Sequence, residues 1–188
     1  MVYEGPPHGG IDVGANYKDV YEKDINLEIS LLLAEQLEKK GAIVYLTRTK
    51  DYDLAVPHAY LRKRSDLSRR VKLINDSNCD LYLSIHLNAS LSTSWRGAQV
   101  FYNDINEKNK KIAFIFQDSF KKNLGSRRKI KEVNDLYMYK RITRPGVLLE
   151  LGFISNANER YILRQKYYQK KIVKAIISAI EIYFKGEH

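Results

Sequence analysis

The stretch from Cys79 to Ala89 limits the possible folds of this chain most, because its pattern is that of a buried strand. Its side chains alternate between two faces, Leu81, Leu83 and Ile85 on one and Tyr82, Ser84 and His86 on the other. The run is short and ends in small polar residues, as central strands of α/β sheets do. Ligands of such sheets bind at the carboxyl ends of the strands, where His86 lies. The sequence therefore indicates a functional histidine if similar residues reach the same place.

Strands and helices alternate along the rest of the chain. Strands are expected at residues 1–4, 42–47, 97–102, 136–139 and 147–153, and helices at 19–40, 60–75, 166–184 and around Ile112, Phe116 and Phe120. We see no internal repeat or linker, and 188 residues suffice for one substantial core. The pattern predicts a single α/β domain over residues 1–188. Its central sheet is expected to be mostly parallel or mixed, with about six strands and helices on both faces.

Three further polar residues lie where this fold would bring them to the same edge as His86. His8 follows the first strand, in a loop rich in glycine and proline. Glu22 stands near the start of the first helix, and Glu150 stands near the end of an apolar strand. Because the carboxyl ends of parallel strands meet at one edge of a sheet, all four side chains can meet there.

Each of these three residues also has a simpler structural explanation, which the sequence leaves open. His8 fits a surface turn. Glu22 follows Asp19 by three residues, which is the spacing of a helix-capping pair. Burying an unpaired carboxylate is costly, so Glu150 could form an ion pair with a neighbour such as Arg144.

Two histidines and a carboxylate form a catalytic zinc set that leaves a fourth position open for water. A second carboxylate beside that water can act as general base and then as general acid. The spacing matches no short helical zinc signature such as H-E-x-x-H. The pattern alone therefore suggests this chemistry without deciding it.

Five separated segments carry a resemblance to a known family. In order they are His8-Gly9-Gly10-x-Asp12-x-Gly14-Ala15, Glu22–Leu27, Thr47-Arg48, Ser84–Ala89 and Leu149–Asn156. Together they resemble the zinc-dependent N-acetylmuramoyl-L-alanine amidases of the type-3 amidase family, over essentially the whole chain. Residues 51–55, 61–64 and 70–75 look closer to one branch, the germination-specific spore-cortex amidases of endospore formers.

The resemblance implies that His8, Glu22 and His86 bind zinc and that Glu150 is the catalytic glutamate. It implies cleavage of the peptidoglycan amide between the lactyl group of N-acetylmuramic acid and L-alanine. In the spore branch this cleavage prepares muramic acid for conversion to muramic-δ-lactam. Relatives carry an export signal or anchor, and some work with a lipoprotein partner. We therefore expect an exported protein of the cell wall or forespore intermembrane space, with a signal or anchor upstream of Met1.

The chain departs from the family just before His8. The family usually has Asp-Pro-Gly there, where this chain has Gly5-Pro6-Pro7. Carboxylates near a metal site often orient the ring of a histidine ligand. The missing aspartate could have oriented the His8 ring, so this departure bears on the zinc affinity of the chain.

The charge of +10 favours polyanionic partners, but it does not distinguish nucleic acid from anionic wall polymers. Arg62-Lys63-Arg64 and Lys129-Ile130-Lys131 could form a nucleic-acid-binding surface. No RNA-binding motif with interleaved aromatics and no helix-turn-helix pattern supports that reading, so we expect no nucleic acid. The basic residues of the 60–75 helix, Arg70 among them, are expected mostly on its solvated face, and residues 121–132 are expected to form an exposed loop.

The sequence is also compatible with a general wall-turnover or lytic amidase, and with a catalytically silent peptidoglycan-binding protein. The single cysteine excludes an internal disulfide. No apolar run is long enough to span a membrane.

Overall fold

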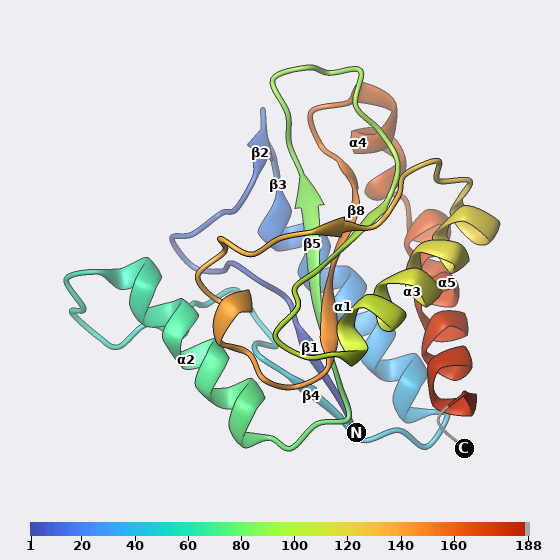
Figure 1. Ribbon diagram of the computed structural model, residues 1–188. Helices are drawn as coiled ribbons and strands as arrows, with labels where there is room; N and C mark the ends of the chain where they lie inside the picture. Colours follow the sequence, from blue (N-terminus) through green and yellow to red (C-terminus); the bar gives the residue numbers. More distant parts are fainter. Residues whose placement is uncertain (187–188) are drawn as a thin grey trace.

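A six-stranded mixed sheet runs through the computed structural model, which describes residues 1–186 (Figure 1). In sheet order its strands are β4 (Val44–Leu46), β1 (Val2–Gly5), β5 (Leu81–Asn88), β8 (Gly146–Phe153), β6 (Gln99–Tyr102) and β7 (Lys131–Glu132). The first four are parallel to one another. β6 runs antiparallel to β8, and β7 is parallel to β6. The predicted α/β fold with a mixed sheet is confirmed.

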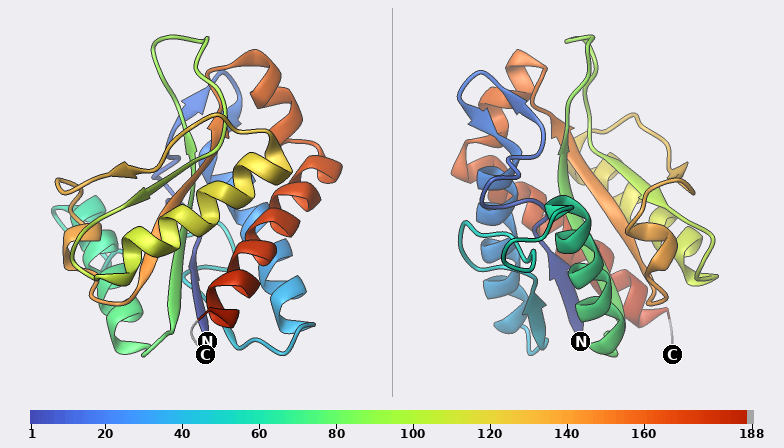
Figure 2. Two further views of the ribbon diagram at one scale, coloured as in Figure 1. Left: turned by 45° about the vertical axis from the view of Figure 1, so that its right-hand side comes forward. Right: turned by 90° about the vertical axis from the view of Figure 1, so that its left-hand side faces the viewer.

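Helices cover both faces of the sheet, as predicted. α1 (Glu22–Glu38), α3 (Lys108–Leu124) and α5 (Lys166–Lys185) lie on one face, and the short α4 (Ala157–Leu163) packs beside β8 and α5. α2 (Arg62–Asp76) covers the other face, which is turned to the viewer in the right-hand view of Figure 2. Within residues 1–186, no helix combines the length and the apolar character that a membrane span requires.

The two faces of β5 enter two different cores, as its alternation predicts. The larger core, on the three-helix face, includes Leu81, Leu83, Ile85, Ile29, Leu33, Phe116, Phe120 and Ile176. The smaller core, on the α2 face, includes Tyr3, Ile74, Tyr82, Met138, Tyr139, Ile142 and Leu148. His86 shares the α2 face of β5 with Tyr82, and its Nε2 lies 3.1 Å from the hydroxyl oxygen of Tyr139 in the smaller core.

The strand predicted at residues 136–139 was wrong. This segment forms a turn that leads into a short 3₁₀ helix, Tyr139–Arg141. The sixth strand is β7, which lies in the basic segment expected to be a loop. β7 takes the outer edge of β6, and Met138 and Tyr139 of the following segment are buried in the smaller core.

The start of the first helix also differs from the prediction. A short hairpin of β2 (Asn16–Tyr17) and β3 (Val20–Tyr21) precedes α1, and the helix begins at Glu22 instead of residue 19. The residue before the helix is Tyr21, whose side chain makes no capping hydrogen bond. The capping explanation for Glu22 is therefore wrong, and its carboxylate is available for other contacts.

Glu4 is a charge-bearing residue in the interior of the sheet. It is fully buried on β1, and burial raises its pKa well above the usual value, only partly offset by the neighbouring Ser30 hydroxyl. The unfolded chain loses this proton near pH 4.5, whereas the raised pKa makes the folded chain hold it to higher pH. Between these two pKa values, folding becomes less favourable by up to about 1.4 kcal/mol for each pH unit.

We predict that Glu4→Leu removes this loss, so that its stability gain over the wild type grows between pH 5 and pH 8. Urea unfolding at both pH values measures the effect. Glu4→Gln is the matched control, because it removes the titrating group without adding apolar contacts. Equal pH slopes for the wild type and both variants would contradict the prediction.

Candidate active site

His8 is held in a strained loop that directs its ring toward α1. Its backbone φ is +61°, in the left-handed region, and two glycines follow it. The Nδ1 atom of His8 lies 2.9 Å from Oδ2 of Asp12. Asp12 thus takes the orienting role that the altered sequence before His8 leaves open. Gly14 must be glycine, since a Cβ there would lie 2.6 Å from the imidazole Cδ2 of His8.

Glu22 lies at the centre of the site and is only 2% exposed. Its Oε2 accepts a hydrogen bond from the backbone N–H of Ala15 (2.7 Å), and its Oε1 accepts one from Leu87 (3.1 Å). The same oxygens face the histidines, with His8 Nε2 at 3.3 Å from Oε2 and His86 Nδ1 at 2.9 Å from Oε1. Both carboxylate oxygens are therefore fixed in place by the backbone.

These contacts shift the protonation of the group. Burial alone would raise the pKa of Glu22, but its hydrogen bonds to His8 and His86 hold the pKa well below its usual range. Burial alone would lower the pKa of His8, but hydrogen bonds to Asp12 and Glu22 raise it to about 9. The site is thus built around one ionised carboxylate.

The three predicted ligands come together as expected. His8, Glu22 and His86 each offer one ligand atom, and these three atoms lie within 4.8 Å of one another. The two imidazole rings meet edge to face, with their centroids 5.4 Å apart. Two nitrogens and one carboxylate oxygen suit a zinc-type ion and leave a coordination position open. Each residue is also held by atoms outside this triangle. The group could therefore hold a metal ion.

Glu150 also lies at this edge of the sheet. It is paired in register with His86 across β5 and β8, so the two side chains share a face. Its Oε2 is buried and has no hydrogen-bond partner within residues 1–186. Burial, and then the negative charge of Glu22, raise the pKa of Glu150 to about 8, although the positive charge of His8 opposes this shift.

The ion-pair explanation for Glu150 was wrong. Arg144 donates instead to the backbone oxygen of Asn75, at 2.8 Å. A buried carboxyl group with a raised pKa and an unused oxygen is suited to proton transfer near neutral pH.

Two buried arginines hold the loop that carries His8, and the sequence interpretation did not identify either role. Arg70 was expected on the solvated face of its helix, but it is 2% exposed and bonded to Asp66 at 2.7 Å. Its guanidinium donates to the backbone oxygens of Pro6 (2.9 Å) and His8 (3.2 Å). One signal in the sequence could have revealed the burial of Arg70. This arginine lies three residues after Leu67 and four before Ile74, on the apolar face of α2.

The second arginine, Arg48, is 1% exposed and joins this loop to α1. It donates to the backbone oxygen of Pro7 in the loop at 3.4 Å, and on α1 to the backbone oxygen of Lys23 at 2.6 Å and to Oδ1 of Asn26 at 2.9 Å. Asn26 in turn donates to the backbone oxygen of Pro7 at 3.1 Å. The backbone oxygens of Pro6, Pro7 and His8 are thus all bound by buried side chains.

Replacing Arg70 with glutamine is expected to destabilise the fold by about 3–5 kcal/mol, because Asp66 is then a buried charge without its partner. The loop that carries His8 should loosen at the same time. Chemical denaturation gives the stability, and amide hydrogen exchange of residues 8–14 gives the loop order. Arg69→Gln is the matched control, since Arg69 is the exposed neighbour on the same helix. A small effect that is equal in both variants would refute the assigned role.

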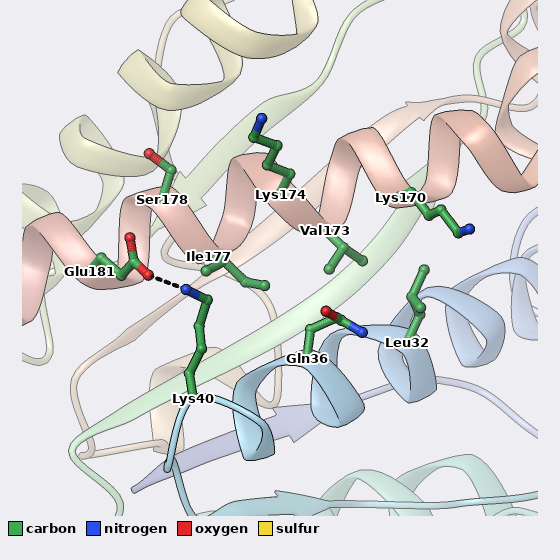
Figure 3. A pocket seen from close by; sticks show the side chains of 9 residues that line it. All are labelled: Leu32, Gln36, Lys40, Lys170, Val173, Lys174, Ile177, Ser178 and Glu181. Carbon is green, nitrogen blue, oxygen red and sulfur yellow. Dashed lines mark hydrogen bonds and ion pairs between the residues drawn. The ribbon is translucent and has the colours of Figure 1, made fainter.

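A groove of about 680 Å³ lies between α1 and α5, away from this site (Figure 3). Leu32, Val173 and Ile177 line it, and Lys40 crosses it to pair with Glu181 at 2.8 Å. The groove begins at Leu32, ten residues along α1 from Glu22. Ten helical residues span about 15 Å, so the groove is separate from the His–Glu–His group.

Comparison with known proteins places this arrangement in a family. The model of the N-acetylmuramoyl-L-alanine amidase family matches residues 5–182. The chain belongs to this family. The resemblance predicted from the five segments is confirmed. The chain is an N-acetylmuramoyl-L-alanine amidase, as its relatives are.

Individual relatives agree with the family assignment. The germination-specific N-acetylmuramoyl-L-alanine amidase of Bacillus subtilis is 42% identical over 193 residues, which cover 100% of this chain and 81% of that protein. The structure of the CwlD amidase from Clostridioides difficile in complex with the GerS lipoprotein matches with a TM-score of 0.93 and 36% identity, over 98% of each chain. An N-acetylmuramoyl-L-alanine amidase from Clostridium difficile 630 matches with a TM-score of 0.88 and 28% identity, over 100% of this chain and 97% of that one.

Proposed function

We propose that this chain is a zinc amidase that cleaves the bond between N-acetylmuramic acid and L-alanine during maturation of spore-cortex peptidoglycan. Residues 1–188 would form its catalytic domain, with His8, Glu22 and His86 as zinc ligands and Glu150 as the proton-transfer residue. The main support is the position of Glu150. Its buried Oε2 has no hydrogen-bond partner among the described residues, and it shares a sheet face with His86 of the His–Glu–His group.

The chemistry divides between the metal and the protein. Zinc held by His8, Glu22 and His86 would supply a Lewis acid for the amide carbonyl and would lower the pKa of a water molecule in the site to around 7. Glu150 takes a proton from the attacking water and returns it to the departing nitrogen of L-alanine. A pKa of about 8 lets Glu150 hold and release that proton near neutral pH. A nearby cation would lower this pKa and favour the base form before the attack.

The remaining residues of the site orient these groups and do not react. Asp12 and the backbone N–H groups of Ala15 and Leu87 fix the ligand atoms before any substrate arrives. Arg48 and Arg70 fix the loop that carries His8 through the backbone oxygens of Pro7 and His8. Such preorganisation reduces the reorganisation that the reaction needs.

The relatives support a proposal for the setting of the reaction. The B. subtilis relative is germination-specific, and the C. difficile relative was solved with a lipoprotein. We infer an extracytoplasmic location and a lipoprotein partner for this chain. Its net charge of +10 suits binding to the anionic stem peptides of peptidoglycan.

Mass spectrometry of digested cortex peptidoglycan tests the proposal. Incubation of the zinc-loaded protein with purified cortex should release stem peptides that begin with L-alanine. Spores without the protein should lack muramic-δ-lactam. Release of stem peptides together with unchanged lactam would favour a general wall-turnover amidase instead. A protein that binds peptidoglycan and releases no peptide would be a catalytically silent binder.

A further inference from the structure

The side chain of Tyr139 reaches the metal-ligand group from the α2 face. Its hydroxyl oxygen lies 3.1 Å from Nε2 of His86 and 2.8 Å from Oγ of Ser84. The residue is buried, and its ring packs in the smaller core. Asn103 fixes the backbone at this point by donating to the carbonyl oxygen of Tyr139 at 2.7 Å. The hydroxyl is therefore held in place from both its own backbone and its neighbours.

The directions of these hydrogen bonds determine what Tyr139 does for His86. The tyrosine hydroxyl has one proton, which it donates to Ser84. Toward His86 it can then act only as an acceptor, so Nε2 of His86 must carry a proton. Without a metal, Nδ1 must also carry a proton to hydrogen-bond the Glu22 carboxylate; when a metal ion displaces that proton, the neutral imidazole keeps Nε2–H and offers the lone pair on Nδ1. That atom faces Glu22, at 2.9 Å from Oε1.

We propose that Tyr139 is a positioning residue that fixes the tautomer and the ring orientation of His86. Its hydroxyl accepts the Nε2–H proton and leaves Nδ1 free to bind a metal ion beside Glu22 and His8. This inference rests on the proposed role of His86 as a metal ligand. Histidine ligands commonly donate their second N–H to a carboxylate or a backbone carbonyl, and here a tyrosine hydroxyl takes that place.

The tyrosine hydroxyl can be removed without disturbing the packing around it. Tyr139→Phe keeps the ring in the smaller core and deletes only the acceptor for Nε2–H. Tyr82→Phe is the matched control, since Tyr82 is a buried tyrosine of the same core. Its hydroxyl is not a partner of His86, because the two ring nitrogens of His86 face Glu22 and Tyr139. Ser84→Ala is a second variant. It removes the acceptor for the tyrosine proton, which can then point at Nε2 and oppose the required tautomer.

Zinc affinity, measured by competition with a chromophoric chelator, is the main readout and needs no enzymatic activity. We expect Tyr139→Phe to bind zinc about 10–100-fold more weakly than the wild type, with Ser84→Ala weakened in the same direction and Tyr82→Phe unchanged. Proton NMR of the zinc-loaded proteins gives a second readout. The Nε2–H proton of His86 should exchange slowly in the wild type and rapidly in Tyr139→Phe.

The outcomes separate this inference from the proposed function. Wild-type affinity and slow Nε2–H exchange in Tyr139→Phe would overturn the role of Tyr139 and leave the amidase proposal intact. A wild type that binds zinc and releases no stem peptide would overturn the amidase proposal and leave the role of Tyr139 intact. A wild type that does not bind zinc would overturn both.

Discussion

Replacing Glu150 with glutamine is expected to lower amidase turnover by about 10³-fold or more, while zinc stays bound. Proton transfer by a well-placed side chain contributes roughly 10²–10⁴-fold to enzymatic rates. Glutamine has nearly the same shape but can neither accept nor return the proton. The residues proposed to hold the metal are His8, Glu22 and His86, and Glu150 is the register partner of His86 on the neighbouring strand. The variant should therefore lose chemistry and keep the metal.

Two measurements on the same sample test this expectation. Stem-peptide release gives the turnover, and elemental analysis after gel filtration gives zinc per chain. Glu132→Gln is the matched control, because Glu132 is an exposed carboxylate on the same sheet. Turnover of Glu150→Gln within tenfold of the wild type would remove Glu150 from the mechanism. Loss of zinc from the variant would instead make it a ligand.

The parts of the fold that follow from local patterns were predictable from the sequence. The alternation in β5 placed His86 on the correct face, and the apolar run in β8 placed Glu150 near the correct end of its strand. Both strands are central and covered on both faces, so burial restricts the residue type at nearly every position. The approach of His8 and Glu22 to His86 then follows from parallel topology.

The parts that depend on contacts between distant segments were not predictable in the same way. Arg70 lies in a run of basic residues. Such a run is compatible with a solvated helix face, but it is equally compatible with one arginine that forms a buried ion pair, as Arg70 does with Asp66. Its role depends on the backbone of Pro6 and His8, more than sixty residues earlier. The short run of large side chains that suggested a strand at residues 136–139 instead leads through a turn into a 3₁₀ helix. Pattern alone does not separate these two cases, because short apolar runs fit both.

Replacing Glu22 with glutamine is expected to abolish zinc retention, and with it amidase activity. The wild-type carboxylate presents one oxygen to the N–H of Ala15 and the other to the N–H of Leu87. A glutamine amide has one oxygen and one NH₂ group, so in either orientation one backbone N–H faces another donor. The negative charge between the two histidines is lost as well. The loss of zinc affinity should therefore exceed the roughly 10–100-fold cost of removing an outer hydrogen-bond partner.

Zinc per chain after dialysis against a weak chelator is the direct measurement, with Asp24→Asn as the matched control. Asp24 is an exposed acid in the same first turn of α1, so the control carries the loss of charge near the helix N-terminus without the loss of a ligand. We expect zinc to be absent from Glu22→Gln and stoichiometric in Asp24→Asn and in Glu150→Gln. This contrast would separate the two buried carboxylates of the site, because Glu22 is proposed to hold the metal and Glu150 only to move a proton. Stoichiometric zinc in Glu22→Gln would show that the two histidines suffice and would leave Glu22 with an orienting role only.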